Sequence, residues 1–283
     1  MQHRLVKLLG PRAPWLMGVV NVTPDSFSDG GLHLAPEAAV AHGRRLLAEG
    51  AHLLDLGGES TAPGSRPITC DEELARLEPV VRALARETVL SIDTYHATTA
   101  ERCIGLGARI INDVSALRAD PGMAAVIRDL GPVLIMMHAK DGPLPHATDR
   151  PAHYDDVVRD VADWLSARVD VALAAGIAAD QIVLDPGWGR FLSLEPADSW
   201  ELLARLDELA ARLTPFPLVV GASRKGFLGG SLAERDPVSQ YVSLVAAERG
   251  AALIRSHDVR LAAQFLGAAE RMHLKLPARR AYR

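Results

Sequence analysis

The chain contains few of the residues that mark several common classes of protein. Its 283 residues include only two cysteines, Cys70 and Cys103, and their spacing matches no metal-binding pattern. We expect both to be reduced thiols, as in a cytoplasmic protein. Aromatic residues make up 5% of the chain, and the net charge is −4. Both values argue against nucleic acid as a partner, because they provide neither a stacking platform nor a basic surface.

Long apolar runs are also missing from the sequence. A helix that crosses a bilayer needs about 20 consecutive apolar residues. The first apolar patch after the basic N-terminal residues covers only 15–20, which is also too short for the apolar region of a signal peptide. We therefore expect a cytoplasmic protein that has no membrane as a partner.

Three familiar catalytic patterns do not occur in the sequence. The absence of a His-x-His pair argues against the bimetallic hydrolase barrels. The absence of G-x-x-x-x-G-K-[ST] argues against a P-loop protein, and the absence of G-x-S-x-G argues against an α/β-hydrolase. The chemistry of this chain must come from another arrangement of residues.

What the chain does contain is a regular alternation of short apolar runs and helical stretches. We predict strands at 16–20, 53–56, 89–92, 109–111, 133–137, 182–184, 218–220 and 253–254. We predict helices at 36–49, 71–86, 97–105, 121–130, 154–175, 197–213, 236–249 and 258–272. Eight such units in about 250 residues predict an α/β fold, the (β/α)8 TIM barrel, as a single domain. We place the barrel at 15–272, with an N-terminal extension at 1–14 and a C-terminal tail at 273–283.

The predicted loops differ in length at the two ends of the strands. Helix-to-strand connections are short, as at 50–51, 87–88, 131–132 and 250–251. Strand-to-helix connections are long, as at 21–35, 57–70, 138–153 and 185–196. Long loops usually carry function, and in a parallel barrel these loops all lie at the C-terminal face. We therefore expect the functional site at that face.

Polar side chains follow seven of the eight predicted strands, and Asp55 lies within the remaining one at 53–56. They are Asn21, Asp55, Asp93, Asn112, Asp113, His138, Asp185, the triplet Ser223, Arg224 and Lys225, and the triplet Arg255, Ser256 and His257. Several of these residues also have a simple structural explanation. Asp55 could serve merely to shape the loop after its strand, and His138 could be a satisfied core histidine. Asp258, the residue after His257, is expected to cap a helix. Their joint position at the mouth of one barrel nevertheless predicts a single polar cavity.

The two sides of this cavity differ in chemistry. Carboxylates and an amide (Asp93, Asn112 and Asp185) suit a flat heterocycle with several hydrogen-bond donors and acceptors. Basic residues (Lys225, Arg255 and His257) suit an anion such as a phosphate. Asn21 offers an oxygen ligand to Mg²⁺, which usually retains several waters.

Seven sequence blocks resemble the motifs of the dihydropteroate synthase family, in the same order. They are GVVNVTPDSFSDGG at 18–31, DLGGEST at 55–61, SIDT at 91–94, INDVS at 111–115, DPG at 185–187, SRK at 223–225 and RSHD at 255–258. The resemblance covers about 16–265, and the first block alone is highly specific.

The resemblance implies a (β/α)8 barrel that often forms a homodimer. The family joins 4-aminobenzoate to 6-hydroxymethyl-7,8-dihydropterin diphosphate and releases diphosphate and 7,8-dihydropteroate. It implies Asp93, Lys225, Arg255 and His257 as catalytic residues and Asn21 as the residue at Mg²⁺. The implied substrate-binding residues are Thr61, Asp93, Asn112, Met137, Asp185, Arg190, Phe191, Gly221, Lys225, Arg255 and His257. The loops at 22–34 and 58–69 are expected to close over the site.

This chain departs from the family pattern at three places. The usual arginine is missing after the Ser-Thr pair at 60–61, and Arg66 could replace it. Arg190 stands where a phenylalanine is usual, so Phe191 could form that wall of the aminobenzoate pocket. Gly226 stands where serine is common. The segment 191–197 also looks like the sulfonamide-insensitive Sul-type synthases, which suggests a pocket that discriminates against sulfonamides.

Two other functions are compatible with a pterin-binding barrel. One is a methyltransferase domain that passes a methyl group to a corrinoid partner, and the other is a non-catalytic pterin-binding paralogue. The first needs neither the cation pair at 255–257 nor the block at 21–25. The second would tolerate the loss of Asn21, Lys225 or Arg255, all of which are present.

Overall fold

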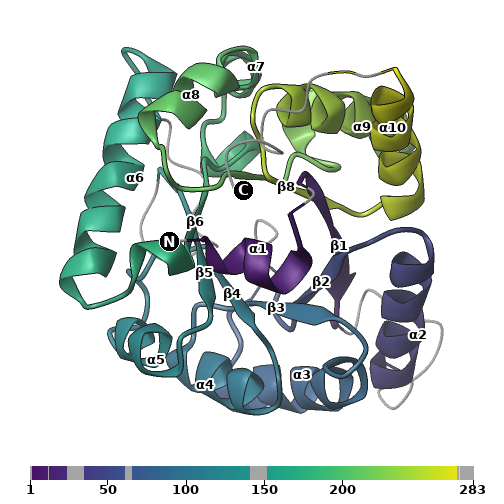
Figure 1. The fold of residues 1–283 in the computed structure, drawn as a ribbon, viewed down its shortest axis with the longest axis vertical. Helices are drawn as coiled ribbons and strands as arrows, with labels where there is room; N and C mark the ends of the chain where they lie inside the picture. The colour runs from purple at the N-terminus through teal and green to yellow at the C-terminus, as the bar shows by residue number, and fades with distance from the viewer. Residues whose placement is uncertain are drawn as a thin grey trace.

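The computed structural model describes residues 2–11, 13–23, 35–60, 66–140, 152–272 and 274. In these ranges, eight parallel strands form one sheet in the order β6-β5-β4-β3-β2-β1-β8-β7. A parallel bridge between Leu184 and Leu218 joins the two ends of that sheet. The large helices surround the strands (Figure 1). The single-domain (β/α)8 barrel predicted from the sequence is confirmed.

The strands extend to the polar residues that follow the predicted apolar runs. Their bounds are β1 Trp15–Asn21, β2 Leu53–Gly57, β3 Val89–Asp93, β4 Ile110–Asp113, β5 Val133–Met137, β6 Ile182–Asp185, β7 Val219–Val220 and β8 Leu253–Ser256. The register pairs Asn21 with Gly57 and Asp93 with Asn112. The polar ends of neighbouring strands therefore lie side by side.

Ten α-helices lie within the described ranges. Their bounds are α1 Arg4–Leu9, α2 Ala35–Ala48, α3 Cys70–Leu84, α4 Ala97–Gly105, α5 Met123–Leu130, α6 Val157–Ala174, α7 Pro196–Ala204, α8 Leu206–Arg212, α9 Leu232–Glu248 and α10 Val259–Arg271. Short 3₁₀ turns, η2 (Ala179–Gln181), η3 (Gly189–Phe191) and η4 (Gly226–Leu228), complete the elements. None of the helices in these ranges combines the length and the apolar content that a bilayer crossing requires.

Two predicted helix boundaries are wrong. The helix predicted at 197–213 is interrupted at Arg205, whose guanidinium lies within 3.0 Å of carboxylate oxygens of Asp156, Glu201 and Glu208. The helix predicted from 236 begins a turn earlier at Leu232, because Ser231 and Glu234 form a capping box. The expected cap at Asp258 is confirmed, since its side chain accepts a hydrogen bond from the backbone N–H of Leu261.

The N-terminal extension contains a helix that the sequence analysis did not identify. Leu5 and Val6 of α1 are buried in one cluster with barrel residues, which include Trp15, Met17 and Leu53. Figure 1 shows α1 in front of the barrel strands. Each large apolar side chain buried here contributes about 1.5–3 kcal/mol to stability. Helix α1 therefore covers the N-terminal end of the barrel.

Alternation along the strands separates an inner face from an outer face. Leu53, Ile110, Val183 and Leu253 belong to the inner cluster, and Leu54, Ile111, Leu184 and Ile254 belong to the outer cluster beneath the helices. Two residues beyond each inner residue comes a polar one: Asp55, Asn112, Asp185 and Arg255 respectively. Because residues two apart on a strand point to the same face, these polar side chains lie on the inner face, at the mouth of the barrel.

Candidate active site at the barrel mouth

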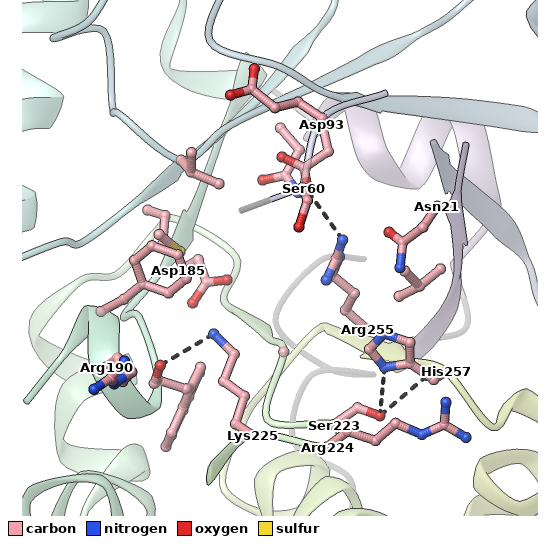
Figure 2. Close-up of a pocket in the computed structure, with 18 of the residues that line it drawn as sticks. Asn21, Ser60, Asp93, Asp185, Arg190, Ser223, Arg224, Lys225, Arg255 and His257 are labelled. Carbon is pink, nitrogen blue, oxygen red and sulfur yellow. Dashed lines mark hydrogen bonds and ion pairs between the residues drawn. The ribbon is translucent and has the colours of Figure 1, made fainter. Parts of the chain in front are cut away.

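A pocket of about 520 Å³ opens at the carboxyl ends of the strands. Every candidate residue that the structure describes lines it: Asn21, Asp93, Asn112, Met137, Asp185, Arg190, Phe191, Gly221, Lys225, Arg255 and His257. Figure 2 shows several of these side chains around one cavity. Thr61 and most of the two loops expected to close over the site (24–34 and 61–65) lie outside the described residues.

The floor of the pocket is a chain of ion pairs centred on Arg255. Its Nε donates a hydrogen bond to Oδ2 of Asp55 at 2.7 Å, and its Nη2 donates one to Oδ2 of Asp93 at 3.1 Å. Asn112 donates a hydrogen bond from Nδ2 to the same oxygen of Asp55 at 3.2 Å. Four strands, β2, β3, β4 and β8, thus meet through one polar network. Asp55, which the sequence analysis treated as a loop-shaping residue, belongs to this floor.

Burial changes the charge balance of the floor. It raises the pKa of Asp93 to about 7, and the nearby Asp55 carboxylate adds to this rise. Burial also raises the pKa of Asp185, although the cation of Lys225 opposes the change. Burial lowers the pKa of Lys225 to about 8. At neutral pH, the floor therefore contains a mostly protonated lysine and an aspartate close to its titration point.

Lys225 is held between the backbone and an aromatic ring. Its ammonium group donates a hydrogen bond to the backbone carbonyl of Trp188 at 3.2 Å and lies 4.8 Å from the centre of the Phe191 ring. Phe191 in turn packs against the cluster that contains Tyr95, Val114 and Met137. These contacts hold the lysine at the side of the cavity where Asp185 also lies (Figure 2).

Asp185 sits in a turn that only glycine can complete. Its Oδ1 accepts a hydrogen bond from the backbone N–H of Gly187 at 2.8 Å. Gly187 has φ +73°, and a Cβ atom there would lie only 2.3 Å from the carbonyl oxygen of His138. Any side chain would collide with the backbone, so the DPG block is required by geometry.

The two adjacent cations of the SRK block have different tasks. Arg224 forms a bidentate pair with Asp236 of α9, at 2.7 and 3.0 Å, and Figure 2 shows its side chain directed away from that of Lys225. Arg224 thus has an anionic partner within the chain itself. Lys225 is therefore the one that reaches the floor.

His257 lies in an environment that favours its neutral form. Burial, followed by the nearby cations Arg255 and Arg224, lowers its pKa to about 3. Its backbone N–H donates a hydrogen bond to Oγ of Ser223 at 3.2 Å, and its Nδ1 lies 3.1 Å from the same oxygen. The sequence analysis counted His257 among the cations, whereas the structure presents it as a neutral hydrogen-bonding group.

A second buried network, which the sequence analysis did not identify, lies beneath the loop after β2. Tyr95 donates a hydrogen bond to Glu59 at 2.9 Å, and Thr94 donates one to Glu73 at 2.9 Å. Nδ1 of His96 lies 3.0 Å from the same oxygen of Glu73, and this contact raises the pKa of His96. Glu59 and the following Ser60 also line the pocket. The network therefore supports the wall of the pocket that Glu59 and Ser60 form.

Asn21 fits the single protein ligand expected at Mg²⁺. It is exposed at the end of β1 and lines the pocket near Thr23. Mg²⁺ bound with a phosphate substrate commonly takes few ligands from the protein and completes its shell with phosphate oxygens and water. One amide oxygen at the rim is compatible with that arrangement.

The three departures from the family motifs are all placed by the structure. Arg66 is 77% exposed and pairs with Glu72 at 3.1 Å, and it does not line the described pocket. Arg190 and Phe191, in η3, line the cavity close to Lys225. Gly226 also lines it, and a Cβ atom there would meet no atom within 4 Å.

The two thiols and His138 have no task in the pocket. Cys70 and Cys103 are free, as expected. His138 is buried against the ring of Trp164, with 5.0 Å between the ring centres, and burial lowers its pKa to about 3. His138 is therefore a core residue, as the alternative interpretation held, although its Nδ1 has no hydrogen-bond partner among the described residues.

A closed barrel whose mouth holds carboxylates, an amide and two buried cations is the architecture of a pterin-binding enzyme. Residues 17–257 match the family model described as "Pterin binding enzyme". The dihydropteroate synthase of Mycobacterium leprae is 43% identical over 256 residues, which cover 87% of this chain and 88% of the relative.

Solved structures agree with the sequence match. A Xanthomonas albilineans dihydropteroate synthase with 4-aminobenzoic acid has a TM-score of 0.85 and 40% identity, and the match covers 94% of this chain and 95% of that one. A Burkholderia cenocepacia dihydropteroate synthase complexed with 7,8-dihydropteroate has a TM-score of 0.82 and 38% identity, with 93% and 92% covered. The chain belongs to the dihydropteroate synthase family, as its motifs predicted. The enzymes of this family are transferases of folate biosynthesis.

Proposed function

We propose that the barrel mouth joins 4-aminobenzoate to 6-hydroxymethyl-7,8-dihydropterin diphosphate, with release of diphosphate. The observation that carries this proposal is the convergence of Asp93, Asn112, Asp185, Lys225 and Arg255 in one cavity. The 4-aminobenzoate and 7,8-dihydropteroate in the two solved structures are one substrate and the product of this reaction.

The floor of the pocket binds the pterin ring in this proposal. Asp93 and Asp185 accept hydrogen bonds from ring N–H groups, Asn112 contributes its amide, and Lys225 donates to a ring acceptor. Met137 packs on the ring face, and Gly221 leaves the cavity open between Arg255 and Asp185, to which a Cβ atom would lie 3.6 and 3.9 Å away.

Charge stabilisation drives the departure of the diphosphate. The reacting methylene carbon becomes positive as its bond to oxygen breaks, and the two aspartates favour that charge. Arg255 and the donor groups of His257 stabilise the leaving diphosphate. Mg²⁺, when bound at Asn21, would further neutralise this negative charge. The weakly basic amine of aminobenzoate then forms the new C–N bond and loses a proton.

One assay separates this reaction from the two other pterin-binding functions. Diphosphate release from the pterin diphosphate is measured with and without 4-aminobenzoate. We expect release that depends on the aminobenzoate. A corrinoid-dependent methyltransferase domain or a non-catalytic paralogue would release no diphosphate under either condition, and that result would refute the proposal.

We further propose that the rim of this pocket discriminates against sulfonamides. Phe191 and Arg190 occupy the wall beside Lys225, and a wall can exclude an analogue where it projects beyond the substrate. Inhibition by sulfamethoxazole is measured beside a sensitive synthase. Equal inhibition of the two enzymes would refute this part of the proposal.

A cytoplasmic homodimer is the assembly that we propose for this enzyme. Val238 and Tyr241 are 36% and 61% exposed on α9, one helical turn apart, so the helix offers an apolar contact surface. Analytical ultracentrifugation should show a dimer, and Tyr241→Glu should weaken it. A monomer at high protein concentration would contradict this assembly.

A further inference from the structure

Asp55 is a buried carboxylate to which the reaction outlined above gives no task. It lies within β2, two residues after Leu53 of the inner core, and its side chain is fully buried. Removing a carboxylate from water is costly unless it is paired. A loop-shaping role does not account for this position, because the side chain points into the barrel rather than toward the loop.

The contacts of Asp55 are unequal between its two oxygens. Oδ2 accepts hydrogen bonds from Arg255 and Asn112, whereas Oδ1 has no hydrogen-bond partner among the described residues. A carboxylate can only accept hydrogen bonds, so it holds the NH₂ end of the Asn112 amide toward itself. The amide oxygen of Asn112 is thereby left for a ligand donor.

Asp55 also divides the guanidinium of Arg255 between two carboxylates. Facing a single carboxylate, a guanidinium commonly forms two parallel hydrogen bonds. Here the shorter bond, at 2.7 Å, runs from Nε to Asp55, and only Nη2 reaches Asp93, at 3.1 Å. While Asp55 holds Nε, the side-on pair of Nε and Nη2 is not available to Asp93.

We propose that Asp55 is a positioning residue for the pterin ring: it holds Arg255 back from Asp93, so that Asp93 remains an acceptor for ring N–H groups. The inference rests on the proposed function, since it concerns the floor that binds the same ring. Asp55 does not touch the substrate in this scheme and acts through Arg255.

The first test is Asp55→Asn, which keeps the shape of the side chain and removes its charge. Arg255 should then pair fully with Asp93. We expect the affinity for 6-hydroxymethylpterin, which lacks the diphosphate and cannot react, to fall at least about tenfold in isothermal titration at pH 8. Ser91→Ala is the matched control, because Ser91 pairs with Asp55 across the sheet and its buried hydroxyl has no partner among the described residues. Its ring affinity should stay unchanged.

A double-mutant cycle tests whether Asp55 acts through Arg255. In an Arg255→Met background, adding Asp55→Asn should not weaken ring binding further. The guanidinium that Asp55 restrains is gone, and the amide oxygen of the new asparagine can still accept the hydrogen bond from Asn112. A further tenfold loss in the double variant would overturn the inference. If thermal melting shows that Arg255→Met does not fold, Arg255→Lys replaces it, since a lysine has no second branch with which to form a bidentate pair.

The pH dependence of ring binding distinguishes positioning from a loss of packing. The charged groups that face Asp93 are Asp55 on β2, Glu73 on α3, Lys225 after β7 and Arg255 on β8. The unaltered chain should lose ring affinity as the pH falls through about 7, where Asp93 takes up a proton. The charge of Asp55 helps to raise the pKa of Asp93, so its removal should lower that pKa. The Asp55→Asn variant should therefore lose its remaining affinity for the pterin ring at a lower pH than the unaltered chain does.

The outcomes separate this inference from the proposed function. An unshifted midpoint in Asp55→Asn, or ring affinity equal to that of the unaltered chain, would overturn the inference alone. Failure of the unaltered chain to bind the pterin would overturn the proposed function and this inference with it.

Discussion

The floor and the rim of the pocket are built in different ways. Floor residues such as Asp93, Asn112 and Arg255 stand at inner positions of strands, where neighbouring strands and mutual hydrogen bonds hold them. Rim residues such as Arg190 and Gly226 stand on short 3₁₀ turns after the strands. The family motifs are intact on the floor and altered at the rim. A change in a turn disturbs few neighbours, whereas a change on the floor leaves buried charges unpaired.

Removing a floor cation is the strongest test of this contrast. Lys225→Ala or Arg255→Ala should lower turnover at least about a hundredfold, since one charge-stabilising donor contributes roughly 3–4 kcal/mol to the barrier. Turnover is measured by diphosphate release, and thermal melting checks that each variant folds. Arg66→Ala is the matched control at an exposed arginine outside the pocket. Near-normal turnover in either floor variant would remove that residue from the mechanism.

The pH profile should reveal the two titrating groups of the floor. Asp93, with a pKa raised to about 7, must be ionised to accept ring N–H groups, and Lys225, with a pKa lowered to about 8, must be protonated to donate. We expect kcat/KM for the pterin diphosphate to fall below about pH 7 and above about pH 8, as a narrow bell.

Two variants identify the limbs of that bell. Asp93→Asn should have low activity, and that activity should no longer fall as the pH decreases below about 7. Lys225→Arg should keep its activity to higher pH, because arginine stays protonated. A profile that is flat from about pH 6 to about pH 9 would contradict both assignments.

Truncation of a rim side chain should have a smaller and more selective effect. Phe191→Ala removes the ring that lies under the Lys225 ammonium, a contact of about 0.5–2 kcal/mol. We expect KM for 4-aminobenzoate to rise roughly tenfold, with a smaller change in KM for the pterin diphosphate. Arg190→Ala, at an exposed neighbour, serves as the comparison. Equal effects on the two substrates would remove the distinction between floor and rim.

The smallest effect is expected from restoring the serine that is common in the family. Gly226→Ser fits without a clash, because a Cβ atom there meets no atom within 4 Å. Its hydroxyl should lower KM for 4-aminobenzoate by no more than about threefold, which is the scale of one exposed hydrogen bond.

Gly187→Ala is the contrasting glycine variant. Its Cβ atom would lie 2.3 Å from the carbonyl oxygen of His138, so this change should lower the melting temperature strongly. Equal melting temperatures for Gly187→Ala and Gly226→Ser would contradict the importance of the backbone contact at Gly187.

Most of the fold could be predicted from the sequence because each strand is a short, continuous apolar run. The polar residues after most runs also marked the site, although His138 after β5 is a core residue. Every described residue that the family resemblance implied for the site lines the pocket. The helix break at Arg205 was missed; the backbone of that residue leaves the helical region, with φ −117° and ψ 25°, and its side chain pairs with Asp156, 49 residues earlier. Helix α1 was missed because its six residues are too few to show a clear period.

The charge states within the site were the least predictable feature. Arg224 and Lys225 are neighbours in the sequence and both line the cavity, yet Arg224 pairs with Asp236 whereas Lys225 donates to the carbonyl of Trp188. His257 appeared as a cation and is neutral, because its pKa depends on burial and on the charges of Arg255 and Arg224. Adjacent residues at the end of a strand point in different directions, and residue types do not show that difference.

Residue order alone established the barrel and the list of polar side chains at its mouth. These features are local, since they follow from the alternation of short apolar runs with helical stretches and from the length of each loop. The pairing of Asp55 with Arg255 joins residues 200 positions apart. Closure of the barrel makes β2 and β8 the two neighbours of β1. This tertiary arrangement decides that Asp55 and Asp93 share the guanidinium of Arg255.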